Sequence, residues 1–375
     1  MEKINYQTQE KILLFFFFVL VFFITFQYNL YKFPDAKNGA LIWFDGKRYL
    51  SPNSLKEVLN HPQFNNFSSY FFYIFAIKKL NLIDYLPIIQ FITFYISAYF
   101  FFRGLNIYGK NVSYLGLIFV LLNPIFFRWC HAVNPTILNI TISLFLVYFF
   151  LIKKNFFFLI IFLILFLKND SKNILNFIFM FSVYLFFIFK DYKKTFYSAL
   201  VIFIYLVIDT FLILSSPMTE NLLEFSKSFK GEDILQFGGQ IIADPKNTLE
   251  ICGMDNSNSI NNHFCSIKNN PIYMFELYLK RFCFTFFWIN KDFSTQYQIL
   301  SGFMILVYYS FFILAFLKLR NKFESFYFFS ICFLLPFIII IPFIIDGNQR
   351  YITHAYVFLT PIVINSLAIF YKKFF

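Results

Sequence analysis

Charged residues are scarce in this chain. Only 14% of its 375 residues are Asp, Glu, Lys or Arg, whereas 59% are hydrophobic, and the mean hydropathy is +0.63. A water-soluble domain needs far more polar surface than this, so the composition excludes that class. It is typical of a protein whose surface faces lipid.

The short motifs of common soluble enzymes are also absent. The sequence has no phosphate-binding glycine-rich loop, no His-Glu-x-x-His, no paired Cys-x-x-Cys and no Gly-x-Ser-x-Gly. Its four histidines are scattered, and no two have the spacing of metal ligands. We therefore predict that no metal is bound through histidine.

Cysteine is sparse too, with five in the chain. Two of them, Cys252 and Cys265, fall in residues 216–272, the one sizeable hydrophilic segment. Outside a membrane this pair can form a disulfide, or both can remain free thiols. The sequence leaves both possibilities open.

Long apolar runs, by contrast, are abundant. About 20 apolar residues let a helix cross a bilayer, and the predicted spans are residues 12–31, 86–102, 112–128, 136–152, 156–168, 174–189, 196–215, 300–317, 325–345 and 352–370. The first run lacks a small-residue cleavage site, so we expect a retained anchor rather than a signal peptide. The predicted fold class is an all-α polytopic membrane protein, with about ten transmembrane helices in a single domain over residues 1–375.

The net charge of +12 is explained by topology. Lys and Arg cluster in the short loops that share a side with the N-terminus, as they do in cytoplasmic loops. Both termini are therefore expected in the cytoplasm. This distribution also argues against a nucleic-acid partner, which the same charge would favour in a soluble protein.

Two further apolar stretches, residues 64–82 and 273–289, carry charges within them. A charge at the bilayer centre costs about 2.5–3.5 kcal/mol, so both stretches are expected to be amphipathic helices lying in the outer interface. The first belongs to an outer loop over residues 32–85, and residues 216–272 form a second outer loop. Polar groups on this outer face are the candidates for chemistry.

An acidic residue stands just beyond the first apolar run. Residues 43–49 read Trp-Phe-Asp-Gly-Lys-Arg-Tyr, which places Asp45 beside two cations and several aromatic rings. Asp45 is either a solvated acid paired with Lys47 or Arg48, or a general base that activates a hydroxyl nucleophile. Asp35, which is closer to the first span, is a second candidate for that base.

Arginine is rare among the cations, with six among 32 Lys and Arg residues. Because its guanidinium pairs with phosphate in a planar, bidentate way, an Arg on the outer face is a candidate anion site. Arg350, followed by Tyr351 before the last run, is either an interface anchor or a phosphate clamp. Arg281 and Lys168 are further candidates for that clamp.

Several short motifs occur in order along nearly the whole chain. They are Asp45 and Tyr49 in an Asp-x-x-x-Tyr after the first span, an amphipathic outer segment, Arg103 and Gly109 before a helix that closes with Asn123-Pro124, Leu167-Lys168 at the end of a span, Asn270-Pro271 ahead of Arg281, and Arg350-Tyr351 before the last helix. This series resembles the GT-C glycosyltransferases, which use polyprenyl-phosphate sugars. The most similar branch includes the protein mannosyltransferases and the lipid A aminoarabinose transferase.

The resemblance implies an inverting sugar transfer on the periplasmic face. Asp45 would deprotonate the acceptor hydroxyl, while Arg350, with Arg281 and Lys168, would hold the departing polyprenyl phosphate. The implied partners are a polyprenyl-phosphate-sugar donor, an acceptor that is a glycan, a lipid or a protein, and membrane lipids. The other substrate-binding residues that it implies are Tyr351, Tyr49, Arg48 and Asp35.

One departure from the family concerns metal. Many members carry an acid in the second outer loop, but residues 131–139 contain none here, and Asn134 or Asn139 stands in its place. We therefore expect chemistry without a divalent metal and without a cofactor.

Two other functions remain open for a membrane-embedded chain with a long outer loop. A polysaccharide polymerase would use a lipid-diphosphate oligosaccharide as its donor. A flippase or other transporter would need polar residues deep within its spans, and these are sparse apart from Asp209. The two halves also lack matching interrupted spans, which are common in transporters.

Overall fold

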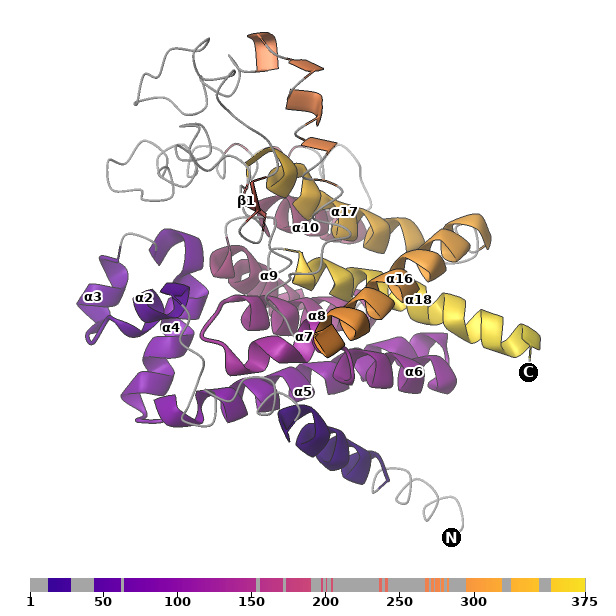
Figure 1. The fold of residues 1–375 in the computed structure, drawn as a ribbon, viewed down its shortest axis with the longest axis horizontal. Helices are drawn as coiled ribbons and strands as arrows, with labels where there is room; N and C mark the ends of the chain where they lie inside the picture. The colour runs from indigo at the N-terminus through magenta and orange to yellow at the C-terminus, as the bar shows by residue number, and fades with distance from the viewer. Residues whose placement is uncertain are drawn as a thin grey trace.

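The computed structural model describes residues 13–27, 44–61, 64–152, 156–170, 173–189, 295–318, 325–343 and 352–374, together with short pieces between residues 197 and 282. Most of this part of the chain is helical (Figure 1). After a first helix, Leu13–Gln27, the helices are α2 (Phe44–Leu50), α3 (Leu55–Leu59), α4 (Phe64–Lys79), η2 (Ile83–Tyr85), α5 (Leu86–Leu105), η3 (Asn106–Tyr108), α6 (Lys110–Leu121), α7 (Pro124–Phe127), η4 (Arg128–His131), α8 (Thr136–Ile152), α9 (Phe156–Asn169), α10 (Ile174–Phe189), α16 (Thr295–Lys318), α17 (Phe326–Phe343) and α18 (Thr353–Phe374). The two-residue strands β1 (Gln236–Phe237) and β2 (Gln240–Ile241) pair antiparallel.

The described helices are those of a membrane-embedded protein. Three are long and apolar enough to cross a bilayer: Ile83–Tyr108, Thr295–Lys318 and Thr353–Phe370. Shorter apolar helices accompany them, at Leu13–Gln27, Thr136–Ile152, Phe157–Asn169, Ile174–Phe186 and Phe326–Ile338. Side chains such as Phe303 and Leu306 on α16 are 60% and 63% exposed, which suits contact with lipid tails and not with water. The expected run over residues 196–215 lies largely outside the described residues.

The run expected over residues 112–128 is not one straight helix. It consists of Lys110–Leu121 and Pro124–His131, which are bent by 46°. Asn123 causes the break, because its side-chain oxygen accepts a hydrogen bond from the Ile125 N–H at 3.0 Å and so caps a new helix. Pro124, which has no N–H, begins that new helix and cannot continue the old one.

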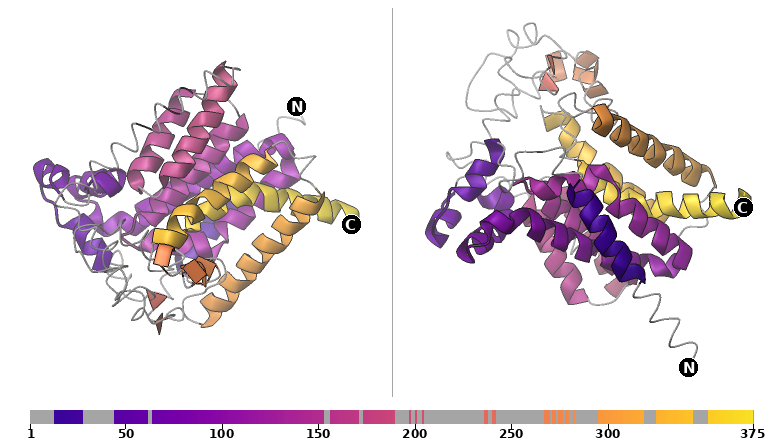
Figure 2. Two further views of the ribbon diagram at one scale, coloured as in Figure 1. Left: turned by 90° about the horizontal axis from the view of Figure 1, so that it is seen from above. Right: turned by 60° about the horizontal axis from the view of Figure 1, so that its bottom comes forward.

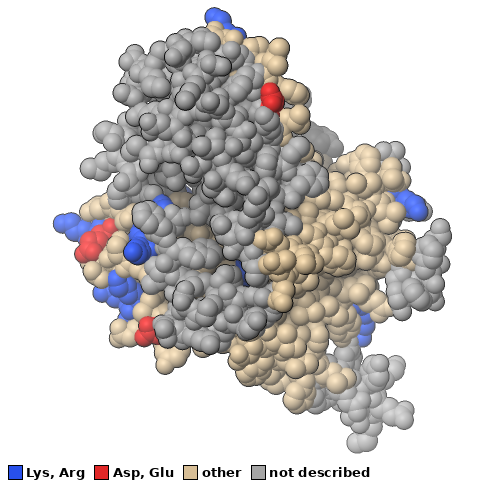
Figure 3. Space-filling model, viewed as in Figure 1, with Lys and Arg blue, Asp and Glu red and all other residues tan. Residues whose placement is uncertain are grey.

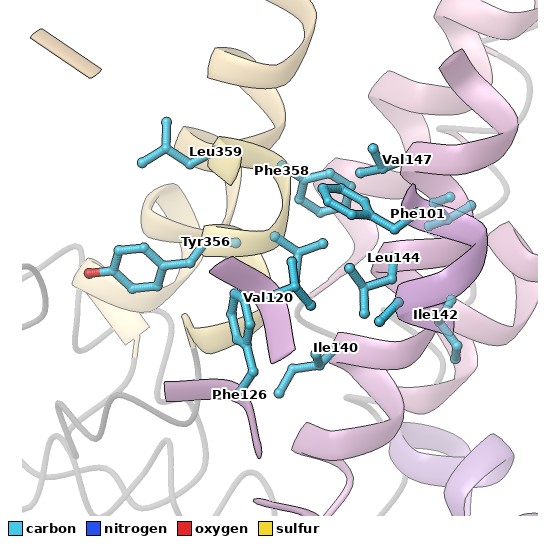
Figure 4. Close-up of a cluster of buried hydrophobic side chains, with 14 of the residues drawn as sticks. Phe101, Val120, Phe126, Ile140, Ile142, Leu144, Val147, Tyr356, Phe358 and Leu359 are labelled. Atoms are coloured by element: carbon cyan, nitrogen blue, oxygen red, sulfur yellow. The ribbon is translucent and has the colours of Figure 1, made fainter. Parts of the chain in front are cut away.

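The bundle is built around α5, α8 and α18. α5 packs against α6 and α8, and α18 packs against α16, α17 and α8; Figure 2 shows these helices from two further directions. Their buried side chains form one core, in which Phe101, Val120, Leu144 and Phe358 come together (Figure 4). This core sets the positions of the helix ends at which polar residues collect.

Helices α2, α3 and α4 form a small unit, here named the cap, beside the end of the bundle where α5 begins (Figure 1). The cap has its own apolar core, which includes Tyr49, Val58, Tyr70, Phe71 and Ile74. The stretch over residues 64–82, expected to be a helix, is helical as α4. Its place in the outer interface remains a prediction.

A capping box starts α3 within the cap. The Asn53 N–H and the Ser54 hydroxyl each donate to the Glu57 carboxylate at 2.8 Å, and the Ser54 oxygen accepts from the Glu57 N–H at 3.2 Å. These donors lower the pKa of Glu57, with the Asn53 N–H contributing most. Their contribution to the cap is present at neutral pH and is lost as the pH falls through that lowered pKa.

The opposite end of the bundle carries exposed cations. Arg103, Lys110 and Lys318 lie there at the ends of α5, α6 and α16. Gly109 makes the turn into α6 with a φ of 116°, a backbone conformation that favours glycine. The Tyr108 hydroxyl, next to that turn, donates to the Ser325 oxygen at 3.4 Å just before α17 begins.

Candidate functional site at the cap end

Several helix ends meet beside the cap, and this region is here named the cap end. The His131 ring of η4 lies 5.1 Å from both Phe26 of the first helix and Phe91 of α5. The ring of Phe166, near the end of α9, lies 5.6 Å from that of His354 at the start of α18. Asn169, in the last turn of α9, donates a hydrogen bond to the Pro135 backbone oxygen just after η4 at 3.0 Å, so these helix ends belong to a single region of the molecule.

The helix that contains Asp45 is fixed to α4 by its aromatic neighbour. Tyr49 is 4% exposed, and its ring packs edge-on against Phe67, Tyr70 and Phe71, with centroids 5.8, 4.9 and 5.1 Å away. The structure thus places Tyr49 in the core of the cap, beneath α2. The Arg48 guanidinium lies over the Tyr49 ring at 5.9 Å and is half-buried.

A lysine ties the chain after α2 to the same helix. The Lys78 Nζ donates to the backbone oxygens of Leu50 and Pro52 at 2.7 and 3.1 Å, and to Asn53 Oδ1 at 2.7 Å. All three donors of the ammonium are used. Lys78 therefore holds the C-terminal end of α2 at a fixed position relative to α4.

Replacement of Lys78 by Met is expected to loosen α2 without unfolding the bundle. The three hydrogen bonds are lost, while much of the aliphatic stem is kept. Hydrogen exchange measured by mass spectrometry should show faster exchange across residues 44–60 and unchanged exchange in α5 and α8. Lys79→Met is the matched control, since the exposed Lys79 overlies the Phe75 ring of its own helix at 5.5 Å. Equal exchange in the two variants would show that Lys78 does not hold α2 in place.

The structure brings the cap and Lys168 together. Lys168 lies in the last turn of α9, and its backbone oxygen accepts a hydrogen bond from Ser68 of α4 at 3.3 Å. The structure describes the backbone of Asp45 in the first turn of α2, but not its side chain. The other predicted site residues, Asp35, Arg281, Arg350 and Tyr351, and the cysteine pair Cys252 and Cys265, lie outside the described residues.

A buried arginine at the cap end was not among the residues picked from the sequence. Arg128 is 3% exposed, and its guanidinium lies 4.2 Å from the ring centre of Trp129 and 5.2 Å from that of Tyr297. Its Nη1 donates to the Tyr297 hydroxyl at 3.1 Å, and that hydroxyl donates to the Pro124 backbone oxygen at 3.0 Å. The aromatic rings hold the guanidinium in one orientation.

The burial of the Arg128 guanidinium bears on the function of the cap end. Ionisable groups within a membrane-embedded bundle are costly, and they usually mark a binding or transport site. Figure 3 shows further Lys and Arg side chains around the cap on the visible face, with Asp and Glu side chains among them. The cap end therefore holds a fixed internal cation, which is suited to binding an anion.

A second polar group, here named the asparagine cluster, consists of Asn139, Asn169 and Asn173. Asn139 Oδ1 accepts hydrogen bonds from Asn169 Nδ2 at 2.7 Å and from Asn173 Nδ2 at 2.9 Å. These bonds join the cap-end parts of α8, α9 and α10. The Oδ1 atoms of Asn169 and Asn173 are buried and have no hydrogen-bond partner among the described residues, although such an unsatisfied acceptor costs about 1–3 kcal/mol.

A third polar group links the break between α6 and α7 to the later helices. Asn123 Nδ2 donates to the Tyr308 hydroxyl at 3.2 Å, and Tyr308 is hydrogen-bonded to Thr360 at 2.9 Å. This chain runs from the break through α16 to α18. Because its members are bonded to one another, it stabilises the bent helix and has no evident catalytic part.

Metal ligands do not gather in the described part of the chain, where no group of three or more His, Cys, Asp or Glu side chains could hold an ion. The buried His131, with an aromatic ring on each of two sides, is positioned by packing.

No protein-family model, curated protein or solved structure matches this chain. Function has to be inferred from the residues of the cap end and their chemistry.

Proposed function

We propose that this protein is a membrane glycosyltransferase of the GT-C type, which moves a sugar from a polyprenyl-phosphate donor to an acceptor on the periplasmic face of a bacterial inner membrane. The observation that carries the proposal is the buried, aromatic-clamped guanidinium of Arg128 at the same end of the bundle as helix α2, which contains Asp45. A fixed cation and a nearby carboxylate are the two charges that such a transfer requires.

The reaction is an inverting displacement. Asp45 takes the proton of the acceptor hydroxyl, whose oxygen attacks the anomeric carbon while the bond from that carbon to the phosphate oxygen breaks. The electron pair of that bond goes to the phosphate, and Arg128 stabilises the charge together with Arg350, Arg281 and Lys168.

The remaining predicted residues have supporting parts in this proposal. Tyr49 has a positioning role, because it packs in the cap core and so holds α2, which contains Asp45. Arg48 lies beside Tyr49 and is proposed to border the site. Tyr351 and Asp35 are proposed to line the substrate path. The donor and its lipid chain reach the site from the bilayer, and the acceptor, a glycan, lipid or protein, reaches it from the periplasm.

The proposed topology has ten spans and both termini in the cytoplasm. It is supported by the cations Arg103, Lys110 and Lys318 at the end of the bundle opposite the cap, because basic loops are retained in the cytoplasm. With that orientation the cap and Arg128 face the periplasm. Transfer is proposed to proceed without a metal, since residues 131–139 contain no acid.

Turnover in reconstituted vesicles tests the proposal. The purified protein is supplied with a panel of radiolabelled polyprenyl-phosphate sugars and a membrane-lipid or glycan extract as acceptor. We expect label to leave the donor lipid and polyprenyl phosphate to accumulate in equal amount. Intact donor after incubation with every sugar in the panel would reject a transferase.

Transport is the second candidate, because one helix is broken. Helices interrupted within the bilayer often border the substrate site of transporters, and α6 and α7 form such a bent pair. The break here is closed by Asn123 and by the bond from Tyr297 to Pro124, so it exposes little backbone for a substrate. Movement of a lipid-linked sugar across the vesicle membrane without cleavage would favour transport.

A further inference from the structure

The two amides of Asn169 and Asn173 are locked in one orientation. Each Nδ2 donates to Asn139 Oδ1, and each has a second acceptor: the Pro135 backbone oxygen for Asn169, at 3.0 Å, and the Phe166 backbone oxygen for Asn173, at 2.8 Å. Both protons of each amide are therefore used. Rotation of either amide by 180° would set its oxygen against two other oxygens.

The carbonyl oxygens of these amides are consequently fixed as acceptors. Both residues are 0% exposed, and neither Oδ1 accepts a hydrogen bond from any described residue. Buried polar atoms of this kind are rare in native proteins and point to an ion or a water molecule bound beside them.

We infer that Asn169 Oδ1 and Asn173 Oδ1, together with Asp170, are ligands of a hard cation, Na⁺ or Ca²⁺. Asp170 is 7% exposed, and its backbone oxygen accepts from the Asn173 N–H at 3.0 Å, which closes the turn between α9 and α10. Amide and carboxylate oxygens are the ligands that such cations prefer.

A cation fits this site better than water does. A water molecule bound to the two amide oxygens uses both of its protons as hydrogen-bond donors. Its lone pairs then need hydrogen-bond donors from the protein. The protons of both amides are already committed, so neither amide can donate to such a water. A cation requires only acceptors, and the Asp170 carboxylate balances one positive charge.

The ion would join α9 to the start of α10, and the hydrogen bonds to Asn139 tie both to α8. Asn139 belongs to α8, Asn169 to α9 and Asn173 directly precedes α10, so their relative positions depend on one site. This role is structural and does not rest on sugar transfer, so it stands or falls separately from the proposed function.

Thermal unfolding of the full-length protein in detergent tests the inference. After exchange into choline chloride, NaCl or CaCl₂ is added at constant ionic strength. We expect one of the two ions to raise the Tm by several degrees in a saturable way, because an ion that binds only the folded state stabilises it. The ion that acts identifies the occupant. The same Tm in all three salts would overturn the cation site.

Variants make the result specific to these residues. Asn169→Leu and Asn173→Leu should abolish the ion-dependent rise, and Asp170→Asn, which keeps the size of the side chain, should raise the half-saturating ion concentration at least tenfold. Asn123→Leu is the matched control: Asn123 is equally buried, but both ends of its amide are bonded. It should lower the Tm and keep the rise. An undiminished rise in Asp170→Asn and in either folded leucine variant would contradict the assignment.

Discussion

Replacement of Asp45 by Asn is expected to lower sugar transfer by about 10²–10⁴-fold, the usual contribution of a general base. The amide has nearly the size of the carboxylate and cannot accept the proton of the acceptor hydroxyl. Expression, membrane insertion and donor binding should stay at wild-type levels, because α2 is held by Tyr49 and Lys78. Release of polyprenyl phosphate from a labelled donor measures the effect.

Asp84→Asn is the control for this change. Asp84 is an exposed acid in η2, next to the cap, and its removal should leave transfer unchanged. Wild-type turnover in Asp45→Asn would dismiss Asp45 as the base and would move that role to Asp35, the other candidate.

Replacement of Arg128 by Met is expected to weaken the binding of the donor by about 10–100-fold, since a hydrogen bond to a charged group contributes about 1.5–3 kcal/mol. Met fills much of the volume of the Arg side chain and brings no charge that must be desolvated on burial, so the variant should fold. Arg128→Lys keeps the charge but loses the planar fork and its stacking on Trp129, and it should show an intermediate loss. The apparent KM for the donor and the binding of polyprenyl phosphate are the quantities to measure.

Arg103→Met serves as the control, because Arg103 is exposed at the opposite end of the bundle. It should leave donor binding unaffected. A folded Arg128→Met protein with unchanged donor affinity would show that the buried guanidinium only supports the packing of Trp129 and Tyr297.

Apolar runs predicted the helices well, because the energetics of a bilayer leave few alternatives. The break at Asn123 was the exception: hydropathy alone treats residues 112–128 as continuous, although an Asn before a Pro is a common start of a new helix. The helical character of α4 was confirmed, despite the charges that argued against a span. Whether ten helices cross the membrane stays a prediction.

The site was harder to predict than the fold. Tyr49 was chosen as a substrate residue, but in a chain with 25 Tyr and 64 Phe residues sequence cannot tell which rings pack and which are exposed. The Arg128 guanidinium is held by Tyr297, which is 169 positions away along the chain, so the sequence around Arg128 does not reveal this contact. The one available signal was that Arg is rare in this chain and that Arg128 stands beside a Trp at the end of an apolar run.

The asparagine cluster shows the same limit. Asn is abundant in this sequence, and Asn139, Asn169 and Asn173 have no characteristic spacing. Only the packing of α8, α9 and α10 brings their amides together. Local sequence carries information on caps and turns, but not on which polar residues become buried neighbours.

An experimental structure of the protein with bound polyprenyl phosphate tests the central claim most directly. The proposed site predicts that the phosphate lies within hydrogen-bonding distance of the Arg128 guanidinium, and that the Asp45 carboxylate faces the same cavity. A phosphate bound at the Arg103 end of the bundle, or an Asp45 side chain that faces away from Arg128, would contradict it.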